Sequence, residues 1–369
     1  MSKNKKKKED GAVRVCSVGG EALMEGIMMK SPVGYAQVVY NTKGNMTVET
    51  KIQPPLSQKN SFLKLPFVRG VAGIVDSLKT GMKCLFRSAE ISGLEEEIPE
   101  EEMSKFDKFL TKKMGDKLPE IIMTVSLIIA VAFSIGLFFI LPGIISDLFD
   151  TWLGLGKFAK TAIEGVVRIA IFFSYMLIVS RMKEIKRVFM YHGAEHKTIH
   201  CYEHMEELTI ENVRKYSKHH PRCGTAFMFV IMIISILVFF LVPDFSFLGN
   251  KFLVILARIL SRLILLPVIV GIGYEFNRLC GKYENWFTKI LRAPGMAMQR
   301  FTTYEPDDKM ITAAIVALKL SMELSADSEV KEQSYILDPD GNPLPEEENP
   351  DSVEIIETDE DVVVKEIKE

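Results

Sequence analysis

The feature that most constrains this chain is a set of long apolar runs that a water-soluble fold could not bury. Residues 121–141 contain no charged side chain, and a helix of about 20 such residues crosses the hydrocarbon core of a bilayer. Three further runs, 162–180, 225–242 and 252–274, have similar character. The sequence therefore predicts an α-helical integral membrane protein with about four transmembrane helices.

The second and fourth runs carry charged residues, which are costly inside a bilayer and rarely face lipid. The four residues form two pairs at i, i+4 spacing: Glu164, Arg168, Arg258 and Arg262. One acid against three bases requires a counter-charge from Asp147, Asp150 or an anionic lipid headgroup. Two interpretations stay open, an ion-paired helix contact and the recognition of a lipid or a substrate.

The region before the first run predicts a small soluble α+β subdomain. Residues 12–18, 35–41 and 46–52 are short and rich in Val, Tyr and Thr, which is typical of strands. Residues 67–89 have apolar positions at helical spacing. This amphipathic helix is expected either to pack on the strands or to lie on the membrane surface.

Lys and Arg residues near the apolar runs predict the orientation. They are abundant before the first run, between the second and third, and after the fourth, and absent from 244–250. By the positive-inside rule, both termini and the middle loop are cytoplasmic, in a bacterial cell membrane. Residues 325–369 carry 16 Asp and Glu against three Lys, a composition that favours disorder.

These patterns divide the chain into five expected regions. They are a basic disordered N-terminus at 1–11, a cytoplasmic α+β subdomain with its linker at 12–118, a four-span membrane domain at 119–274 containing the His-rich loop 181–224, a cytoplasmic segment at 275–324 and an acidic disordered tail at 325–369.

All six histidines fall in the predicted loop between the second and third spans. They are His192, His196, His200, His204, His219 and His220. The first four recur every fourth residue, so each step along a helix turns the stripe by only about 40°. Two adjacent histidines can therefore contact the same bound ion or molecule, whereas all four cannot.

Residues 192–196 read His-Gly-Ala-Glu-His, the H-x-x-E-H form in which two imidazoles bind zinc and the glutamate activates water. His192 and His196 are the predicted ligands of a divalent metal ion, zinc in the simplest case, and Glu195 is the predicted catalytic base. The candidates for further ligands or site residues are His220, Cys223, Glu275, His200, Glu203 and Arg222. The alternative is a polar helix whose histidines are solvated or hydrogen-bonded.

Several segments resemble a known family. VGGEALMEGIMMKSP, YHGAEHKTIHCYE, HPRCGTAF, YEFNRLCG and APGMAMQRFTTYEPDD occur in the order found in the YqhQ-like family of bacterial membrane proteins of unknown function. The resemblance runs from about residue 13 to residue 320. It implies a multi-pass membrane protein and a metal-dependent enzyme, and it brings no established reaction.

Three functional hypotheses follow. The first is a metal-dependent hydrolase with its site at the cytoplasmic face. The second is a non-enzymatic scaffold for membrane-protein biogenesis or envelope assembly, in which the Gly19-Gly20, Glu25-Gly26 and 294–306 segments are loops of a docking surface. The third is a metal or lipid carrier that uses Arg258 and Arg262. The expected partners are membrane lipids and either a protein at the cytoplasmic face or a second copy of the chain.

Other classes of function lack support in the sequence. It contains no phosphate-binding loop, dinucleotide fingerprint or nucleophile elbow. No basic recognition motif indicates nucleic acid. Five widely spaced cysteines predict reduced thiols rather than a disulfide framework.

Overall fold

The computed structural model describes residues 16–93, 118–243, 245–282, 286–328, 330–344, 353–357 and 362–366. The chain divides into two compact units. Unit 1 comprises Met1–Leu94, Ile178–Ile231 and Val270–Glu369, and unit 2 comprises Glu95–Leu177 and Met232–Ile269.

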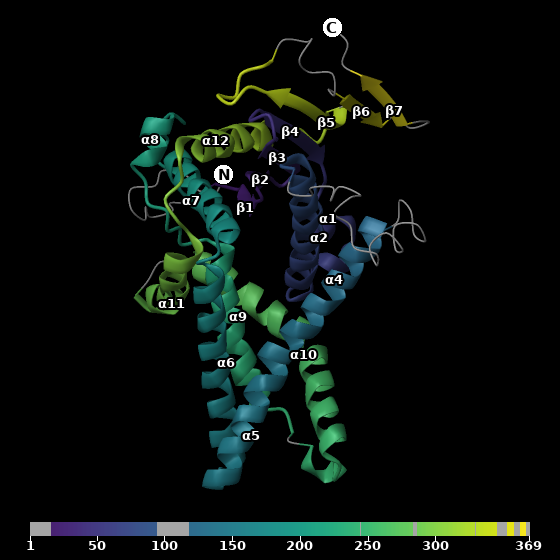
Figure 1. The fold of residues 1–369 in the computed structure, drawn as a ribbon, viewed down its shortest axis with the longest axis vertical. Coiled ribbons are helices and arrows are strands. Elements are labelled where there is room, and N and C mark those ends of the chain that lie inside the picture. Colours follow the sequence, from purple (N-terminus) through teal and green to yellow (C-terminus); the bar gives the residue numbers. More distant parts are fainter. Residues whose placement is uncertain are drawn as a thin grey trace, which may run out of the picture. The chain divides into compact units, whose positions relative to one another are not determined.

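Unit 1 is built on an antiparallel sheet, whose strands in the described residues follow one another in chain order. Their bounds are β1 Gly19–Leu23, β2 Gly26–Lys30, β3 Gly34–Tyr40, β4 Met46–Ile52, β5 Val330–Leu337, β6 Val353–Glu357 and β7 Val362–Glu366 (Figure 1). Because each strand pairs only with its neighbours in this order, β1 lies at one edge of the sheet.

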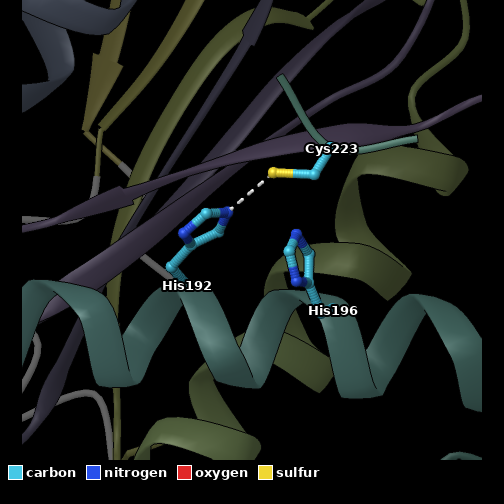
Figure 2. Close-up of side chains that lie close together, drawn as sticks. All are labelled: His192, His196 and Cys223. Atoms are coloured by element: carbon cyan, nitrogen blue, oxygen red, sulfur yellow. Dashed lines mark hydrogen bonds between the residues drawn. The ribbon is translucent and has the colours of Figure 1, made fainter. Parts of the chain in front are cut away.

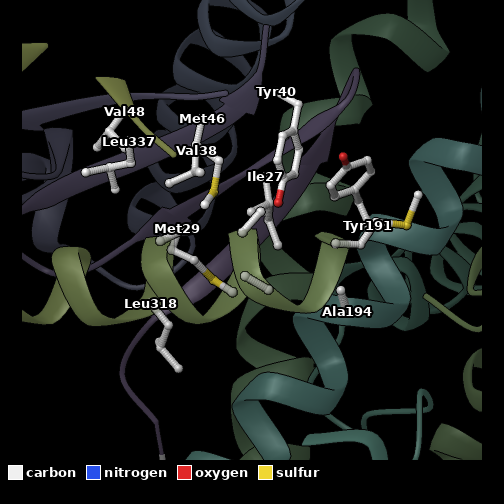
Figure 3. Close-up of a cluster of buried hydrophobic side chains, with 14 of the residues drawn as sticks. Ile27, Met29, Val38, Tyr40, Met46, Val48, Tyr191, Ala194, Leu318 and Leu337 are labelled. Atoms are coloured by element: carbon white, nitrogen blue, oxygen red, sulfur yellow. The ribbon is translucent and has the colours of Figure 1, made fainter. Parts of the chain in front are cut away.

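Alternate side chains of the strands enter two different cores, as the period of two in a strand requires. Ile27, Met29 and Val38 pack with Tyr191 and Met310 on one face (Figure 3). That face is covered by α7, Lys183–Glu203, and α12, Asp308–Glu323.

The other face of the sheet is covered by α2, Val68–Ile91, which confirms the helix predicted over 67–89. Leu23, Met28, Tyr35 and Val39 pack against Cys84 of this helix. Short turns precede it, α1 Leu56–Lys59 and η1 Phe62–Lys64. The remaining helices of unit 1 are α8 Ile210–Arg214 and α11 Trp286–Thr302.

The apolar runs form helices, but fewer of them than predicted reach the length of a membrane span. Among the described residues, three are long and apolar enough to cross a membrane: Thr124–Leu153, Lys157–Val179 and Phe252–Leu279. They belong to α4 Leu118–Ile135 with α5 Leu141–Leu153, to α6 Lys157–Val179 and to α10 Lys251–Lys282. The third predicted span is α9, Gly224–Phe239, which is apolar but shorter.

The first apolar helix continues beyond residue 141, because α5 extends it to Leu153. A π-helical segment, Gly136–Ile140, joins α4 to α5, and Pro142 stands in the first turn after it. A π segment already departs from the i→i−4 hydrogen-bond pattern, so the missing N–H of the proline does not end the helix.

Several strand and loop predictions were wrong in detail. Residues 16–18 form no strand, and 12–15 lie outside the described residues. Gly19 and Gly20, expected in a loop, belong to β1, and Pro294 lies inside α11. Glycine weakens a strand only modestly, and here the close approach of α7 to β1 requires it, as described below.

The prediction of a disordered tail after residue 325 does not hold for residues 330–337. They form β5, which pairs with β4 from Met46↔Leu337 to Lys51↔Glu332. Composition favoured disorder, but β4 offers this segment an unpaired edge.

Candidate metal centre

Helix α7 positions the predicted site because one side of the helix packs against the sheet and another side carries the histidines. Tyr191 and Ala194 are buried in the core against the sheet. At about 100° per residue, His192 and His196 lie on another side of the helix, and Glu195 lies between the two. The sequence of one helical turn thus holds a carboxylate between the sheet and a pair of imidazoles.

His192, His196 and Cys223 form a compact group. One ligand atom from each lies within 4.8 Å of the others. The Cys223 Sγ is 3.3 Å from the His192 Nε2, and the two imidazole rings are 4.4 Å apart. Figure 2 shows the three side chains directed toward one another. Two imidazoles and a thiol are a donor set that zinc accepts.

Backbone carbonyls hold both imidazoles in the orientation that a metal ligand needs. The His192 Nδ1 lies 2.8 Å from the Thr302 carbonyl, and the His196 Nδ1 lies 2.6 Å from the Lys218 carbonyl. A carbonyl can only accept, so each Nδ1 carries the proton and each Nε2 keeps its lone pair.

The His196 Nε2 is buried and has no hydrogen-bond partner among the described residues. A buried nitrogen without a partner is destabilising unless something binds it. Burial, followed by the neighbouring His192, lowers the pKa of His196 well below its ordinary value, so the ring is neutral. A neutral imidazole with a free lone pair beside a second imidazole and a thiol fits a metal ion.

Glu195 contacts the edge strand β1. Its Oε1 accepts a hydrogen bond of 3.0 Å from the Gly20 N–H. A Cβ at residue 20 would lie 2.7 Å from the Glu195 Cδ, so only glycine allows this approach. Burial raises the pKa of the Glu195 carboxyl to about 7, despite the opposing effect of His192. A carboxyl with this pKa can accept or donate a proton near neutral pH.

The loop that carries Cys223 is fixed by a side chain of α11. The His220 N–H donates to the Gln299 Oε1, and the Gln299 Nε2 donates to the His220 carbonyl, both at 2.8 Å. Gln299 is completely buried. At the other end of the loop, the Thr225 N–H lies 3.4 Å from the Cys223 Sγ, in the first turn of α9.

A second group, His200, Glu203 and His220, also has ligand atoms within 4.8 Å of one another. Here the nitrogens of His220 have partners, because Nε2 lies 3.5 Å from the Glu203 Oε2 and Nδ1 accepts from the Arg222 N–H. Glu203 also accepts from the Arg222 guanidinium and, at 2.6 Å, from the Cys16 N–H. This group is a hydrogen-bonded network next to the first group, and it ties Arg222 to α7.

Glu275, predicted as a further ligand, is in neither of these groups. Its two carboxylate oxygens accept hydrogen bonds of 2.7 and 2.6 Å from the Arg69 guanidinium. It joins α10 to α2 within unit 1.

The predicted intramembrane charges of unit 2 pair with one another. Glu164 accepts from Arg168 at 2.7 Å and from Arg262 at 2.7 Å. Arg258 lies 3.4 Å from Asp147, one of the two aspartates considered as counter-charges. The guanidiniums of Arg168 and Arg262 also lie over the ring of Phe239.

The carbonyls that complete this cluster come from the π segment. The Arg168 Nε donates to the Phe138 carbonyl, and the Arg262 Nη1 lies 3.4 Å from the Phe139 carbonyl. The ion-paired helix contact, one of the two interpretations of these charges, therefore describes the observed contacts of Glu164.

Three residues that hold the site together were placed by the sequence only in the loops of a possible docking surface, not at the metal site. Gly20, Gln299 and Thr302 each contact a candidate ligand, its loop or the candidate base. All three stand in segments that carry the family resemblance. A search for polar residues in those segments would have selected Gln299 and Thr302, whereas their partners depend on the tertiary fold.

Comparison with known proteins identifies the family. Residues 65–324 match the family described as "Protein of unknown function (DUF1385)". The chain is also 32% identical over 318 residues to the uncharacterised protein YqhQ of Bacillus subtilis strain 168, covering 84% of this chain and 94% of the relative. No solved structure matches. The expected resemblance is thereby confirmed, and the chain belongs to the YqhQ-like family, DUF1385, whose function is unknown.

Proposed function

We propose that this chain is a membrane-anchored, metal-dependent hydrolase in which His192, His196 and Cys223 hold a divalent ion such as zinc. The observation that carries the proposal is the buried His196 Nε2, which has no partner among the described residues and lies beside the other two donors. Three protein ligands leave one position of a tetrahedral ion open, which is the arrangement of catalytic zinc sites.

The ion, when bound, would supply Lewis-acid polarisation of a substrate oxygen. The protein residues supply the rest. Thr302 and Lys218 fix the imidazoles through their carbonyls, and Gln299 fixes the loop of Cys223. Glu195 accepts a proton from water on its carboxylate and returns it to the leaving group. The Gly20 N–H holds that carboxylate in place.

Membrane anchoring is supported by the three long apolar helices in the described residues and by α9, which begins immediately after Cys223. The site thus stands at the end of an apolar helix. The basic segments around the apolar runs favour a bacterial cell membrane with the site and both termini on the cytoplasmic side.

The test is the metal content of full-length protein purified in detergent without added metal. We expect close to one equivalent of a transition metal in the unaltered chain and a loss of at least fivefold in the double variant His192→Ala, His196→Ala. His204→Ala is the matched control, since His204 lies at the end of α7 and is in neither ligand group. Metal below about a tenth of an equivalent, unchanged in the double variant, would reject the proposal.

A second candidate function is favoured by one contact. The Cys223 Sγ lies 3.3 Å from the His192 Nε2, whose other nitrogen donates to the Thr302 carbonyl. This is the order of nucleophile, base and orienting group found in thiol enzymes. Cys223 also precedes the N-terminus of α9, where the helix dipole favours a thiolate.

The rate of alkylation by iodoacetamide separates the two candidates. A thiol nucleophile reacts rapidly whether or not a chelator is present, and His192→Ala slows the reaction. A metal ligand is protected until the chelator removes the ion. Cys201 is the internal control, because it is buried and burial raises the pKa of its thiol to about 11.

A further inference from the structure

The edge strand β1 leads directly to Glu195. The register Leu23↔Gly26 closes the two-residue turn between β1 and β2, so the backbone groups of Leu23, Glu21 and Gly19 bond to β2. The groups of the residues between them point away from the sheet. Two observed contacts agree, since the Gly20 N–H reaches Glu195 and the Met24 N–H reaches the Ser88 hydroxyl.

Between these two contacts, the register turns the N–H and C=O of Ala22 outward. In the described part of the chain, β1 pairs only with β2, and no other residue bonds these two groups. The Gly20 carbonyl also points to this side. An edge of this kind is a template for an additional strand.

A groove runs along the same edge. It has a volume of about 390 Å³ and is lined on the α2 side by Ile74, Leu78, Met82 and Leu85. Of these side chains, Leu78 is 62% exposed, whereas Leu85 also packs against the core cluster that contains Leu23 and Cys84. On the β1 side the groove is lined by Glu21, Ala22 and Leu23.

We infer that an extended polypeptide segment binds as an added strand on β1, with an apolar side chain in the α2 groove, and that such a segment is the substrate of the site at Glu195. The inference rests on the proposed function. Strand addition supplies main-chain hydrogen bonds for affinity and a pocket for alternate side chains. Ala22 and Gly20 are two residues apart, about 7 Å along a strand, so a peptide paired with Ala22 extends to Glu195.

The groove alone would also fit a lipid surface, but the edge does not. Unpaired N–H and C=O groups are costly in contact with hydrocarbon, whereas an extended peptide satisfies both.

The probe is a fluorescein-labelled octapeptide of alternating valine and glutamate, titrated into full-length protein in lipid nanodiscs and followed by fluorescence anisotropy. We expect saturable binding. The same peptide N-methylated at alternate amides should bind at least tenfold more weakly, because it cannot pair with an edge.

Two variants test the protein side. Ala22→Pro removes the outward N–H without removing a bond to β2, and Leu78→Asp places a charge in the exposed groove. Each should weaken binding of the valine and glutamate peptide at least fivefold, whereas Lys43→Ala, in the distant β3–β4 turn, should leave that binding unchanged. Equal affinities for the methylated and unmethylated peptides would overturn the inference. It would also be overturned if Leu78→Asp left peptide binding unchanged and altered only the quenching of the protein's fluorescence by brominated lipid.

The peptide assay does not depend on catalysis, so the two proposals can fail separately. If the purified protein contains no metal but binds the peptide, the hydrolase is rejected and the strand site is kept. Metal bound at His192 and His196 without any peptide binding keeps the hydrolase and overturns the strand site.

Discussion

At the scale of single residues, two neighbouring carboxyls on opposite sides of the sheet have raised pKa values. Glu195 approaches β1 from α7, whereas Glu21 points from β1 to α2, where a Cβ at Gly81 would lie 1.9 Å from its Oε2. Burial raises the pKa of Glu21 to about 7, against the attraction of Lys30. Burial of a carboxyl favours its protonated form.

This pKa predicts how stability depends on pH. The folded chain keeps the Glu21 proton up to about pH 7, whereas the unfolded chain releases it near 4.5. The contribution of Glu21 to stability is therefore complete below pH 4.5 and falls as pH rises through 7. We expect Glu21→Gln to stabilise the protein at pH 8 by about 2 kcal/mol and to have no effect at pH 4.5.

Thermal unfolding between pH 4.5 and pH 8 measures the effect. Glu90→Gln is the matched control, because Glu90 lies on the exposed side of α2 in a salt bridge with Arg87. An equal change in unfolding temperature at both pH values would show that Glu21 is not protonated by burial.

Adjacent glycines of β1 provide a second residue-scale prediction. A Cβ at Gly20 would meet the Glu195 side chain, whereas a Cβ at Gly19 meets nothing within 4 Å. We expect Gly20→Ala to destabilise unit 1 by about 2 kcal/mol through overpacking and Gly19→Ala to be neutral. Chemical denaturation of the two variants measures the difference, and equal stabilities would contradict the close packing of Glu195 on β1.

At the scale of elements, α11 supports the proposed metal site. It supplies the Thr302 carbonyl to His192 and the Gln299 amide to His220, three residues before Cys223. Neither residue is a candidate ligand. Groups that orient ligands commonly change metal affinity by about 10-fold to 100-fold when they are removed.

Gln299→Leu is therefore expected to weaken metal binding at least tenfold while leaving His192, His196 and Cys223 in the chain. Competition with a chelator measures the affinity. Arg300→Ala is the control, because its side chain is exposed on the same helix. Unchanged metal affinity in Gln299→Leu would mean that the loop of Cys223 keeps its position without the two hydrogen bonds between Gln299 and His220.

The element scale also explains which features the sequence could predict. Helix α7 and its histidine spacing follow from local periodicity, as do β3, β4 and α2. Local patterns could not place Glu275 against Arg69, because that contact joins residues 206 positions apart. The strand β5 was missed for a related reason, since an acidic segment becomes a strand only where an edge such as β4 receives it.

At the scale of the whole molecule, the set of chain segments that make up unit 1 constrains how the chain could cross a bilayer. Unit 1 takes in the chain before, between and after the apolar helices, and it is one compact unit. Its segments must then share one side of a membrane. The chain leaves unit 1 after Leu94 and after Ile231, and each excursion must cross an even number of times to return.

For a chain inserted in a bilayer, we therefore predict that α9 crosses together with α10, although its 16 residues are short for a span. They extend about 24 Å, and a bilayer can thin locally to match a short apolar helix. This topology predicts that the turn between α9 and α10, in which Phe247 is 77% exposed, lies on the outer side.

Thiol labelling in intact cells tests this topology. We expect a membrane-impermeant maleimide to modify Phe247→Cys in intact cells and to modify Lys43→Cys and Glu206→Cys only after lysis. The last two residues are exposed in unit 1, one beside the sheet and one after α7. The unaltered chain provides the background, and Cys16, Cys84, Cys201 and Cys223 are buried or half-buried in it. Labelling of Glu206→Cys before lysis would place the histidine site on the outer side, and protection of Phe247→Cys would mean that α9 does not cross.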